Sequence, residues 1–190
     1  KVGKNASGMY VIDADYNIVS YNHAAEIMNA VKNGVLITTK SGDKVNSMTI
    51  SWGMLGIEWN RPVFITFVRE SRFTKEMLDE SMNFTVNIPF GEFDKRIVSF
   101  CGAHSGRDVD KAKALNLTML PSDSIPSPAV AELPLTLECN VIYRQMQDKN
   151  AIPTSVKADF YPAGEDRHAH DNQDFHIAYY GEIVKAYIIE

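Results

Sequence analysis

The alternation of apolar and polar side chains along the chain is most regular between residues 44 and 53. This alternation predicts a β-strand with two different faces, because successive side chains of a strand point to opposite sides. The apolar face would enter a core, and the other face would carry a row of hydroxyls able to address the edge of a flat heterocycle. The apolar set is Met48, Ile50 and Trp52, and the hydroxyl set is Ser47, Thr49 and Ser51.

Other stretches of the chain carry strand patterns of the same kind. A turn at Ser41-Gly42-Asp43 joins the first of them to the stretch described above. The run at 63–68 is apolar without alternation, as in a strand covered on both sides. In the run at 133–143, Thr136, Glu138 and Asn140 form the polar side. Strands are predicted at 34–39, 63–68, 84–88, 133–143 and 175–189, the last with a bend or bulge at Gly181, and a separate hairpin is predicted at 9–21.

Helices are predicted between these strands. Thr74 is the expected N-cap of the second helix, whose Met77 and Leu78 should point inward. Helical patterns cover residues 23–30, 75–81, 92–100 and 109–115. The patterns together indicate a mainly β protein, in which an antiparallel barrel of Greek-key type satisfies the strand edges and a few short helices lie between strands. We expect a single domain over 1–190, with a core at about 30–189 and an N-terminal hairpin extension at about 1–25.

Composition narrows the class of function. The chain has 190 residues and a net charge of -5, which argues against the broad basic surface needed for nucleic acid. No apolar run is long enough to span a membrane. Cys101 and Cys139 lie far apart and form no CxxC pair, so neither a disulfide framework nor a zinc site is expected. These features favour a cytoplasmic protein.

The segment before the helix at 75–81 is a candidate anion site. A helix N-terminus offers unpaired amides and the positive end of the macrodipole, and here it is flanked by two hydroxyls and a guanidinium. Ser71, Arg72 and Thr74 could therefore hold a phosphate. An ordinary helix cap beside a surface arginine is the other interpretation of the same residues.

Two polar segments are further candidate sites. His168 and His170, in the long polar stretch between Gln145 and Asn172, could bind a metal, but no further spaced ligand accompanies them, which favours a solvated loop. The loop at 103–108 has a high capacity for hydrogen bonding, and a solvated connection is its alternative. The sequence contains neither a recognisable catalytic triad nor a GxGxxG fingerprint.

Five motifs in order along the chain resemble the flavin reductase-like family, the FMN-binding split β-barrel group that includes flavoredoxin. The resemblance covers about residues 30–189. The motifs are Asn46-Ser47-Met48-Thr49-Ile50-Ser51-Trp52-Gly53, Arg69-Glu70-Ser71-Arg72-Phe73-Thr74, Phe84-Thr85-Val86-Asn87-Ile88-Pro89, Cys101-Gly102 with Ser105-Gly106-Arg107-Asp108-Val109-Asp110-Lys111, and His176 to Val184. The polar segment before His176 and the N-terminal hairpin depart from the family pattern.

The resemblance implies a homodimer with FMN near the subunit interface. It implies that the hydroxyl strand contacts the isoalloxazine and ribityl groups and that Ser71, Arg72 and Thr74 hold the phosphate, with Trp52 either near the ring or in the core. The cofactor-binding residues implied are Asn46, Ser47, Met48, Thr49, Ser51, Trp52, Ser71, Arg72, Thr74, Asn87, Cys101, Gly102, Ser105, Gly106, Arg107 and Lys111.

The resemblance also implies an FMN-dependent oxidoreductase in which NAD(P)H delivers hydride to flavin N5 and electrons pass onward. The flavin carries the chemistry, so no catalytic side chain is expected. One alternative is a non-enzymatic FMN electron carrier serving a redox protein partner. Another is a flavin-free β-barrel module.

Overall fold

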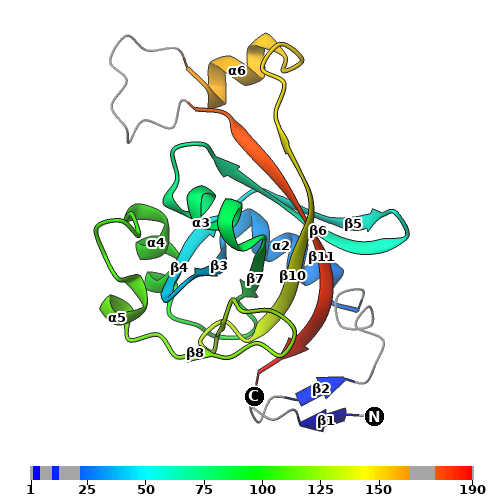
Figure 1. The fold of residues 1–190 in the computed structure, drawn as a ribbon, viewed down its shortest axis with the longest axis vertical. Helices are drawn as coiled ribbons and strands as arrows, with labels where there is room; N and C mark the ends of the chain where they lie inside the picture. The colour runs from blue at the N-terminus through cyan, green and yellow to red at the C-terminus, as the bar shows by residue number, and fades with distance from the viewer. Residues whose placement is uncertain (1, 5–9, 13–21, 163–173, 190) are drawn as a thin grey trace.

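A computed structural model describes residues 2–4, 10–12, 22–162 and 174–189 of the chain (Figure 1). The strands are β1 Val2–Lys4, β2 Tyr10–Ile12, β3 Val35–Ser41, β4 Lys44–Ile50, β5 Gly53–Glu58, β6 Arg61–Arg69, β7 Asn83–Ile88, β8 Met119–Leu120, β9 Ala129–Val130, β10 Leu135–Met146 and β11 His176–Ile188. The helices are α2 Ala24–Asn33, α3 Phe73–Ser81, α4 Lys95–Ala103, α5 Lys111–Leu115 and α6 Thr154–Phe160.

Antiparallel pairing joins the long strands into one curved sheet. The pairing runs β4-β3-β7-β10-β11, and β11 continues through β6 to β5. The two edge strands, β4 and β5, are consecutive in the chain and are joined by Ser51 and Trp52. The sheet must therefore curve round until its edges approach each other, which gives the predicted barrel.

The barrel is split at one place. In the described part of the chain, β4 pairs with β3 alone, and no ladder joins it to β6. We call this opening between β4 and β6 the seam. Because Ser51 and Trp52 cross the end of the seam, their side chains are available to whatever lies there.

The barrel interior is a continuous apolar core. Met77 and Leu78 of α3 are buried, as the helical pattern predicts. Gly181 allows a close approach within the core, since a Cβ there would lie 2.6 Å from a Phe84 ring carbon. A bulge in the β10–β11 ladder, between Val141 and Tyr143, lies opposite Gly181. The predicted irregularity at Gly181 is thus confirmed, although the extra residue belongs to β10.

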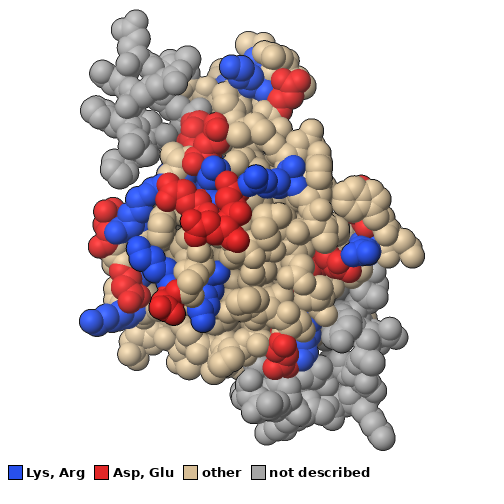
Figure 2. Space-filling model, in the orientation of Figure 1, with Lys and Arg blue, Asp and Glu red and all other residues tan. Residues whose placement is uncertain are grey.

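Helices α4 and α5 lie on the outside of the barrel next to β3 and β4, whereas α6 stands apart at the end of the long β10–β11 ribbon (Figure 1). Basic and acidic side chains alternate over the α3 to α5 side on the face shown in Figure 2. No helix among the described residues has both the length and the apolar content needed to cross a bilayer.

Several sequence expectations need correction. Thr74 is not the N-cap of α3: the cap position is Arg72, and Thr74 is buried inside the first turn. Glu138 lies on the polar side of β10, as the alternation predicts, but it is buried, and its carboxylate accepts hydrogen bonds from the amides of Asp123 and Ser124 at 3.1 and 2.8 Å. The segment 121–128 therefore covers the polar side of β10. Helix α6 was not expected.

The N-terminal hairpin is only partly covered by the described residues. Tyr10–Ile12 forms a strand that pairs antiparallel with Val2–Lys4 and, at Tyr10, with Ile188 of β11. The expected turn and second strand at 13–21 lie outside the described residues, as do His168 and His170. Within the described residues, no group of three or more His, Cys, Asp or Glu side chains could hold a metal ion.

Candidate functional site

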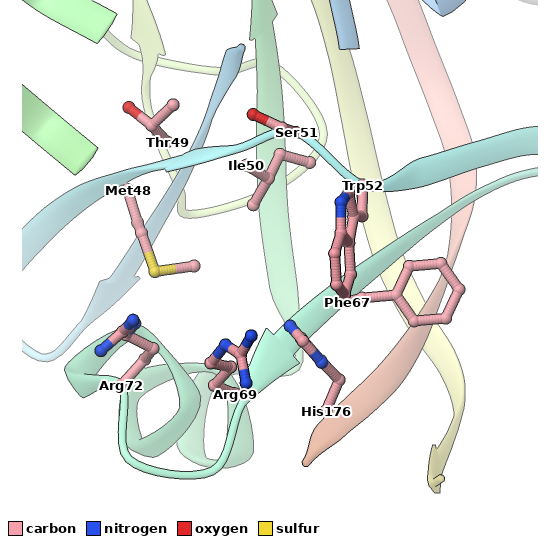
Figure 3. Close-up of a pocket in the computed structure, with 9 residues that line it drawn as sticks. All are labelled: Met48, Thr49, Ile50, Ser51, Trp52, Phe67, Arg69, Arg72 and His176. Carbon is pink, nitrogen blue, oxygen red and sulfur yellow. The ribbon is translucent and has the colours of Figure 1, made fainter. Parts of the chain in front are cut away.

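The seam contains a cavity of about 280 Å³. The end of β4 and the Ser51-Trp52 link form one wall, and the ends of β6 and β11 with the start of α3 form the other (Figure 3). Figure 3 shows the Met48 side chain pointing from β4 toward the arginines on the opposite wall. The lining residues are Met48, Thr49, Ile50, Ser51, Trp52, Phe67, Arg69, Arg72 and His176. We call this space the seam cavity.

Two guanidinium groups lie on the wall opposite β4. Arg69 is held by the carbonyl oxygens of Asp174 and Phe160, which accept from its two terminal nitrogens at 2.5 and 3.2 Å. Burial lowers the pKa of Arg69, yet an arginine remains charged at neutral pH. Arg72 occupies the cap position of α3, where the helix dipole adds positive potential. The seam cavity therefore favours an anionic group at this wall.

Aromatic rings form the other end of the cavity. The Trp52 ring lies 4.8 Å from the ring of His176 and 5.2 Å, edge to face, from that of Phe160. His176 is 6% exposed, and its cross-strand partner in the β6–β11 ladder is Arg69. Burial, with the charge of Arg69 as a second cause, lowers the pKa of His176 to about 4. The imidazole is therefore neutral at pH 7.

A second cavity of about 550 Å³ adjoins the first. It shares Ser51, Trp52 and Phe67 with the seam cavity, so Trp52 stands between the two. Its other lining residues are mainly apolar and come from α2 and the start of β5: Met28, Val31, Lys32, Gly53 and Met54, together with Gln147.

Five of the sixteen predicted cofactor residues line the seam cavity: Met48, Thr49, Ser51, Trp52 and Arg72. Trp52 is 37% exposed and lines the cavity, so it does not lie in the core. The hydroxyls of Ser47 and Thr49 are less available to a ligand than the alternation along the strand suggests. Ser47 is buried against the Thr38 hydroxyl at 2.8 Å, and Thr49 donates to the Val98 carbonyl of α4 at 2.6 Å.

Most of the other predicted residues fasten the 101–111 segment to the back of β4. The buried Lys111 amine donates to the carbonyls of Ser47 and Cys101 at 2.8 and 2.9 Å, and burial lowers its pKa. Cys101 is a buried free thiol whose pKa burial raises. Gly102 packs on Thr49, to which an added Cβ would come within 3.4 Å.

The same segment also reaches α3. Arg107 donates to the Ser71 carbonyl at 3.1 Å and pairs with Glu76 at 2.5 Å, and its own amide donates to the Ser105 hydroxyl. Gly106 lies against Asn46, whose side-chain amide donates to the Thr74 hydroxyl at 2.9 Å. These contacts set the position of the α3 N-terminus relative to β4, and so the width of the seam cavity.

The remaining two predicted residues have different surroundings. The amide of Ser71 donates to Asp174 Oδ2 at 2.7 Å, while Ser71 Oγ and Asp174 Oδ1 are buried and have no hydrogen-bond partner. Asp174 offsets part of the positive charge near Arg69. Asn87 is fully buried, donating to Thr38 and Thr85 and accepting from Val130, so it lies in the core and not at the cavity.

Four lining residues were absent from the sequence-based site: Ile50, Phe67, Arg69 and His176. Arg69 and His176 belong to the family motifs given above, but no local sequence pattern marks either residue as part of a site. They meet because β6 and β11 pair in register at the ends of the two strands.

Comparisons with known proteins show the family to which the chain belongs. A profile described as "Flavin reductase like domain" matches residues 28–190. The chain belongs to the flavin reductase-like family. A comparison with curated protein sequences finds no match.

Solved structures of similar fold support the assignment of the architecture. Flavoredoxin of Desulfovibrio vulgaris (Miyazaki F) is 22% identical, with a TM-score of 0.61, over 83% of this chain and 69% of that one. An FMN-binding protein from Thermus thermophilus is 20% identical, with a TM-score of 0.58, over 82% and 69%. Nitrilotriacetate monooxygenase component B from Bacillus cereus is 17% identical, with a TM-score of 0.60, over 83% and 69%. The fold is the flavin reductase-like split β-barrel.

The seam cavity fits the requirements of a flavin nucleotide. FMN combines a flat apolar ring system with a phosphate, and the cavity combines apolar and aromatic side chains with two guanidinium groups. The unpartnered Ser71 hydroxyl beside Arg72 is a further buried polar atom that a ligand could satisfy. The residues that would hold the ring are Met48, Trp52 and Phe67, and those that would hold the phosphate are Arg72 and Ser71, with Arg69 adding charge.

Proposed function

We propose that this protein binds FMN in the seam cavity and acts as an oxidoreductase that takes electrons from NAD(P)H. The observation that carries the proposal is the convergence of Arg69 and Arg72 with Trp52 and His176 on one cavity at the seam. Membership in the flavin reductase-like family supports it. A cytoplasmic location is part of the same proposal.

The chain's own residues have three tasks in this function. Arg72, at the cap of α3, provides charge-assisted hydrogen bonds to a phosphate. Trp52 provides an aromatic surface beside the ring system. The apolar residues of the barrel around the cavity exclude water, which strengthens polar contacts made inside it.

FMN, when bound, supplies the redox chemistry by accepting a hydride from NAD(P)H at N5 and passing the electrons onward. The neighbouring cavity behind Trp52 would then offer apolar surface for a second molecule near the flavin. Its lining of Met28, Val31 and Met54 suits a flat, weakly polar group.

The electron-carrier hypothesis remains the second candidate. Flavoredoxins are among the proteins of similar fold, from Desulfovibrio vulgaris and from Methanosarcina acetivorans. In this role the same cavity would retain FMN, and a redox protein partner would replace the nicotinamide nucleotide as the reaction partner.

The visible spectrum of the FMN-reconstituted protein under anaerobic conditions tests both hypotheses. Bleaching of the bound flavin on addition of NADH or NADPH supports the oxidoreductase and identifies its donor. Bleaching by dithionite, but by neither nucleotide, supports the electron carrier. A protein that binds no flavin would overturn the whole proposal and leave the flavin-free module.

We also propose that the protein is a homodimer. Three large apolar side chains of the β5–β6 hairpin, Met54, Ile57 and Trp59, are more than half exposed. Met54 lines the cavity behind Trp52, so the hairpin that carries these side chains borders that cavity. A second copy of the chain on this surface would cover them and close the cavity.

A further inference from the structure

Gln147, Tyr161 and His176 form a hydrogen-bonded cluster in the wall of the seam cavity. Gln147 follows β10, Tyr161 follows α6, and His176 begins β11. The Tyr161 hydroxyl lies 2.9 Å from Gln147 Oε1 and 2.8 Å from His176 Nδ1. Tyr161 and His176 are both more than nine-tenths buried. The Tyr161 side chain and the inner side of the His176 ring are therefore largely shielded from water, and their polar atoms find their hydrogen-bond partners within the cluster.

The direction of each bond follows from the donors available. The backbone amide of His176, which can only donate, points at Gln147 Oε1 at 3.3 Å, so that atom is the acceptor of the side-chain amide. Tyr161 must then donate its single proton to the same oxygen. Its hydroxyl has only lone pairs left for His176 Nδ1. Nδ1 must therefore carry a proton.

The other ring nitrogen consequently has a lone pair. A neutral imidazole carries one proton, and the lowered pKa of His176 keeps the ring neutral at pH 7. Figure 3 shows the outer nitrogen of the ring directed toward the space between β4 and the arginines. Among the charged and imidazole groups that line the seam cavity, Arg69 and Arg72 can only donate hydrogen bonds, whereas Nε2 of His176 accepts.

We propose that Tyr161 and Gln147 are positioning residues that hold His176 as the Nδ1–H tautomer, so that Nε2 accepts a hydrogen bond from an N–H or O–H group of the ligand. The identity of that ligand rests on the proposed function. The imide N–H of a flavin ring and the hydroxyls of its ribityl chain are donors of the required kind. A ligand with only acceptor atoms at this end of the cavity would be disfavoured.

Nitrogen NMR of the ligand-free protein, labelled with ¹⁵N-histidine, tests the tautomer directly. At pH 7 we expect the His176 spectrum of a ring with a protonated Nδ1 and a bare Nε2. Tyr161→Phe removes the acceptor of the Nδ1 proton and should move part of the population to the Nε2–H form. A wild-type ring protonated at Nε2 would overturn the proposal.

A second variant changes the same cluster at Gln147 and leaves the Tyr161 hydroxyl in place. Gln147→Leu removes the acceptor of the Tyr161 proton, which can then be donated to Nδ1, so the Nε2–H form should become the major one. Tyr143→Phe, on the exposed part of β10 and outside the cluster, is the matched control and should leave the ring unchanged. If neither Tyr161→Phe nor Gln147→Leu changes the tautomer, the hydrogen-bonded cluster does not set the tautomer of His176.

Titration with FMN tests the role of Nε2 in binding. Loss of one hydrogen bond worth about 0.5 to 1.5 kcal/mol corresponds to roughly 2- to 12-fold weaker binding of FMN by Gln147→Leu. An unchanged affinity, despite a changed tautomer, would overturn the assignment of Nε2 as a ligand contact. Because the NMR measurement needs no flavin, a wild-type protein that binds no FMN would refute the proposed function while leaving the tautomer assignment in place.

Discussion

Arg72 is the residue on which recognition of a phosphate would depend most. It stands at the cap of α3 and lines the seam cavity, whereas the terminal nitrogens of the neighbouring Arg69 donate to backbone carbonyls. The two arginines therefore have different tasks. Arg69 holds the segment around Phe160 and Asp174 against β6, and we propose that Arg72 contacts the phosphate of the ligand.

Replacing Arg72 with alanine should weaken FMN binding far more than riboflavin binding. The change removes a charge-assisted contact worth about 1.5 to 3 kcal/mol, which is roughly a 10- to 150-fold loss for the ligand that carries the phosphate. Fluorescence titration with both flavins measures it. Arg96→Ala, an exposed arginine of α4 paired with Asp94, is the control and should bind both flavins as the wild type does. An equal loss for FMN and riboflavin would place the phosphate elsewhere.

His176 should make folding stability depend on acidity. Its pKa is about 4 in the folded protein, because of burial and the nearby charges of Arg69 and Arg72, which outweigh the opposing effect of Asp174. An unfolded histidine has a pKa of about 6.5. The unfolded state therefore binds the proton first as pH falls, so stability is lost between about pH 6.5 and pH 4, by up to about 3 kcal/mol.

Urea unfolding of the wild type and of His176→Gln at several pH values isolates this contribution. The wild type should lose more stability than the variant over that range, and the difference should level off above about pH 6.5. Parallel profiles for the two proteins would mean that His176 has an ordinary pKa. Acidic groups elsewhere titrate in both proteins and cancel in the comparison.

At the scale of elements, the segment 101–111 matters because it braces the α3 N-terminus against β4. Gly106 is its point of closest approach: a Cβ there would lie 2.1 Å from Asn46 Oδ1. Asn46 cannot give way freely, since its amide is bonded to the buried Thr74 hydroxyl. We expect Gly106→Ala to destabilise the protein by about 1 to 3 kcal/mol, as measured by urea unfolding.

Gly56→Ala is the matched control for this substitution. Gly56 lies in β5 with open space around its Cα, so the added methyl group should change the free energy of unfolding by less than about 0.5 kcal/mol. Similar losses for both variants would show that the close approach of Gly106 to Asn46 has no energetic effect. Weaker FMN binding by Gly106→Ala would further link this brace to the width of the seam cavity.

Elements with a buried face were the ones that the sequence could predict. The alternation in β4 and β10 and the apolar run in β6 arise because each strand contributes to the barrel core. Helix α6 has no buried residue, so it leaves no apolar period in the sequence, and its segment looked patternless. Glu138 lies on the predicted polar side of β10, but its burial could not be predicted, because two backbone amides, and not water, satisfy its carboxylate.

The candidate site was predictable only where one local segment provides it. Met48, Thr49, Ser51 and Trp52 come from a single strand and its link, and Arg72 from one helix cap. His176 and Arg69 are brought together by the register of β6 and β11, which no local pattern records. Lys111 and Arg107, which are predicted to contact the cofactor, donate hydrogen bonds to backbone carbonyls of β4 and of the segment before α3, and no local pattern indicates these partners.

At the scale of the whole molecule, the exposed apolar side chains of β5 predict a contact with a second copy of the chain. Ile57 is 57% exposed and Met54, three residues before it on the same strand, is 53% exposed. If a second copy covers them, light scattering should give a mass of two chains for the wild type. Met54→Asp and Ile57→Asp should shift the protein toward the monomer, because each would bury an unpaired carboxylate in the interface.

Val156→Asp provides the comparison that makes this result specific. Val156 is an exposed apolar residue of α6, which stands apart from β5 at the end of the β10–β11 ribbon (Figure 1). The variant should remain a dimer. A monomeric wild type, or dissociation by Val156→Asp alone, would exclude β5 as the interface. Weaker FMN binding that accompanies dissociation by Met54→Asp would place the second copy next to the flavin, because Met54 belongs to the cavity that shares Trp52 with the seam cavity.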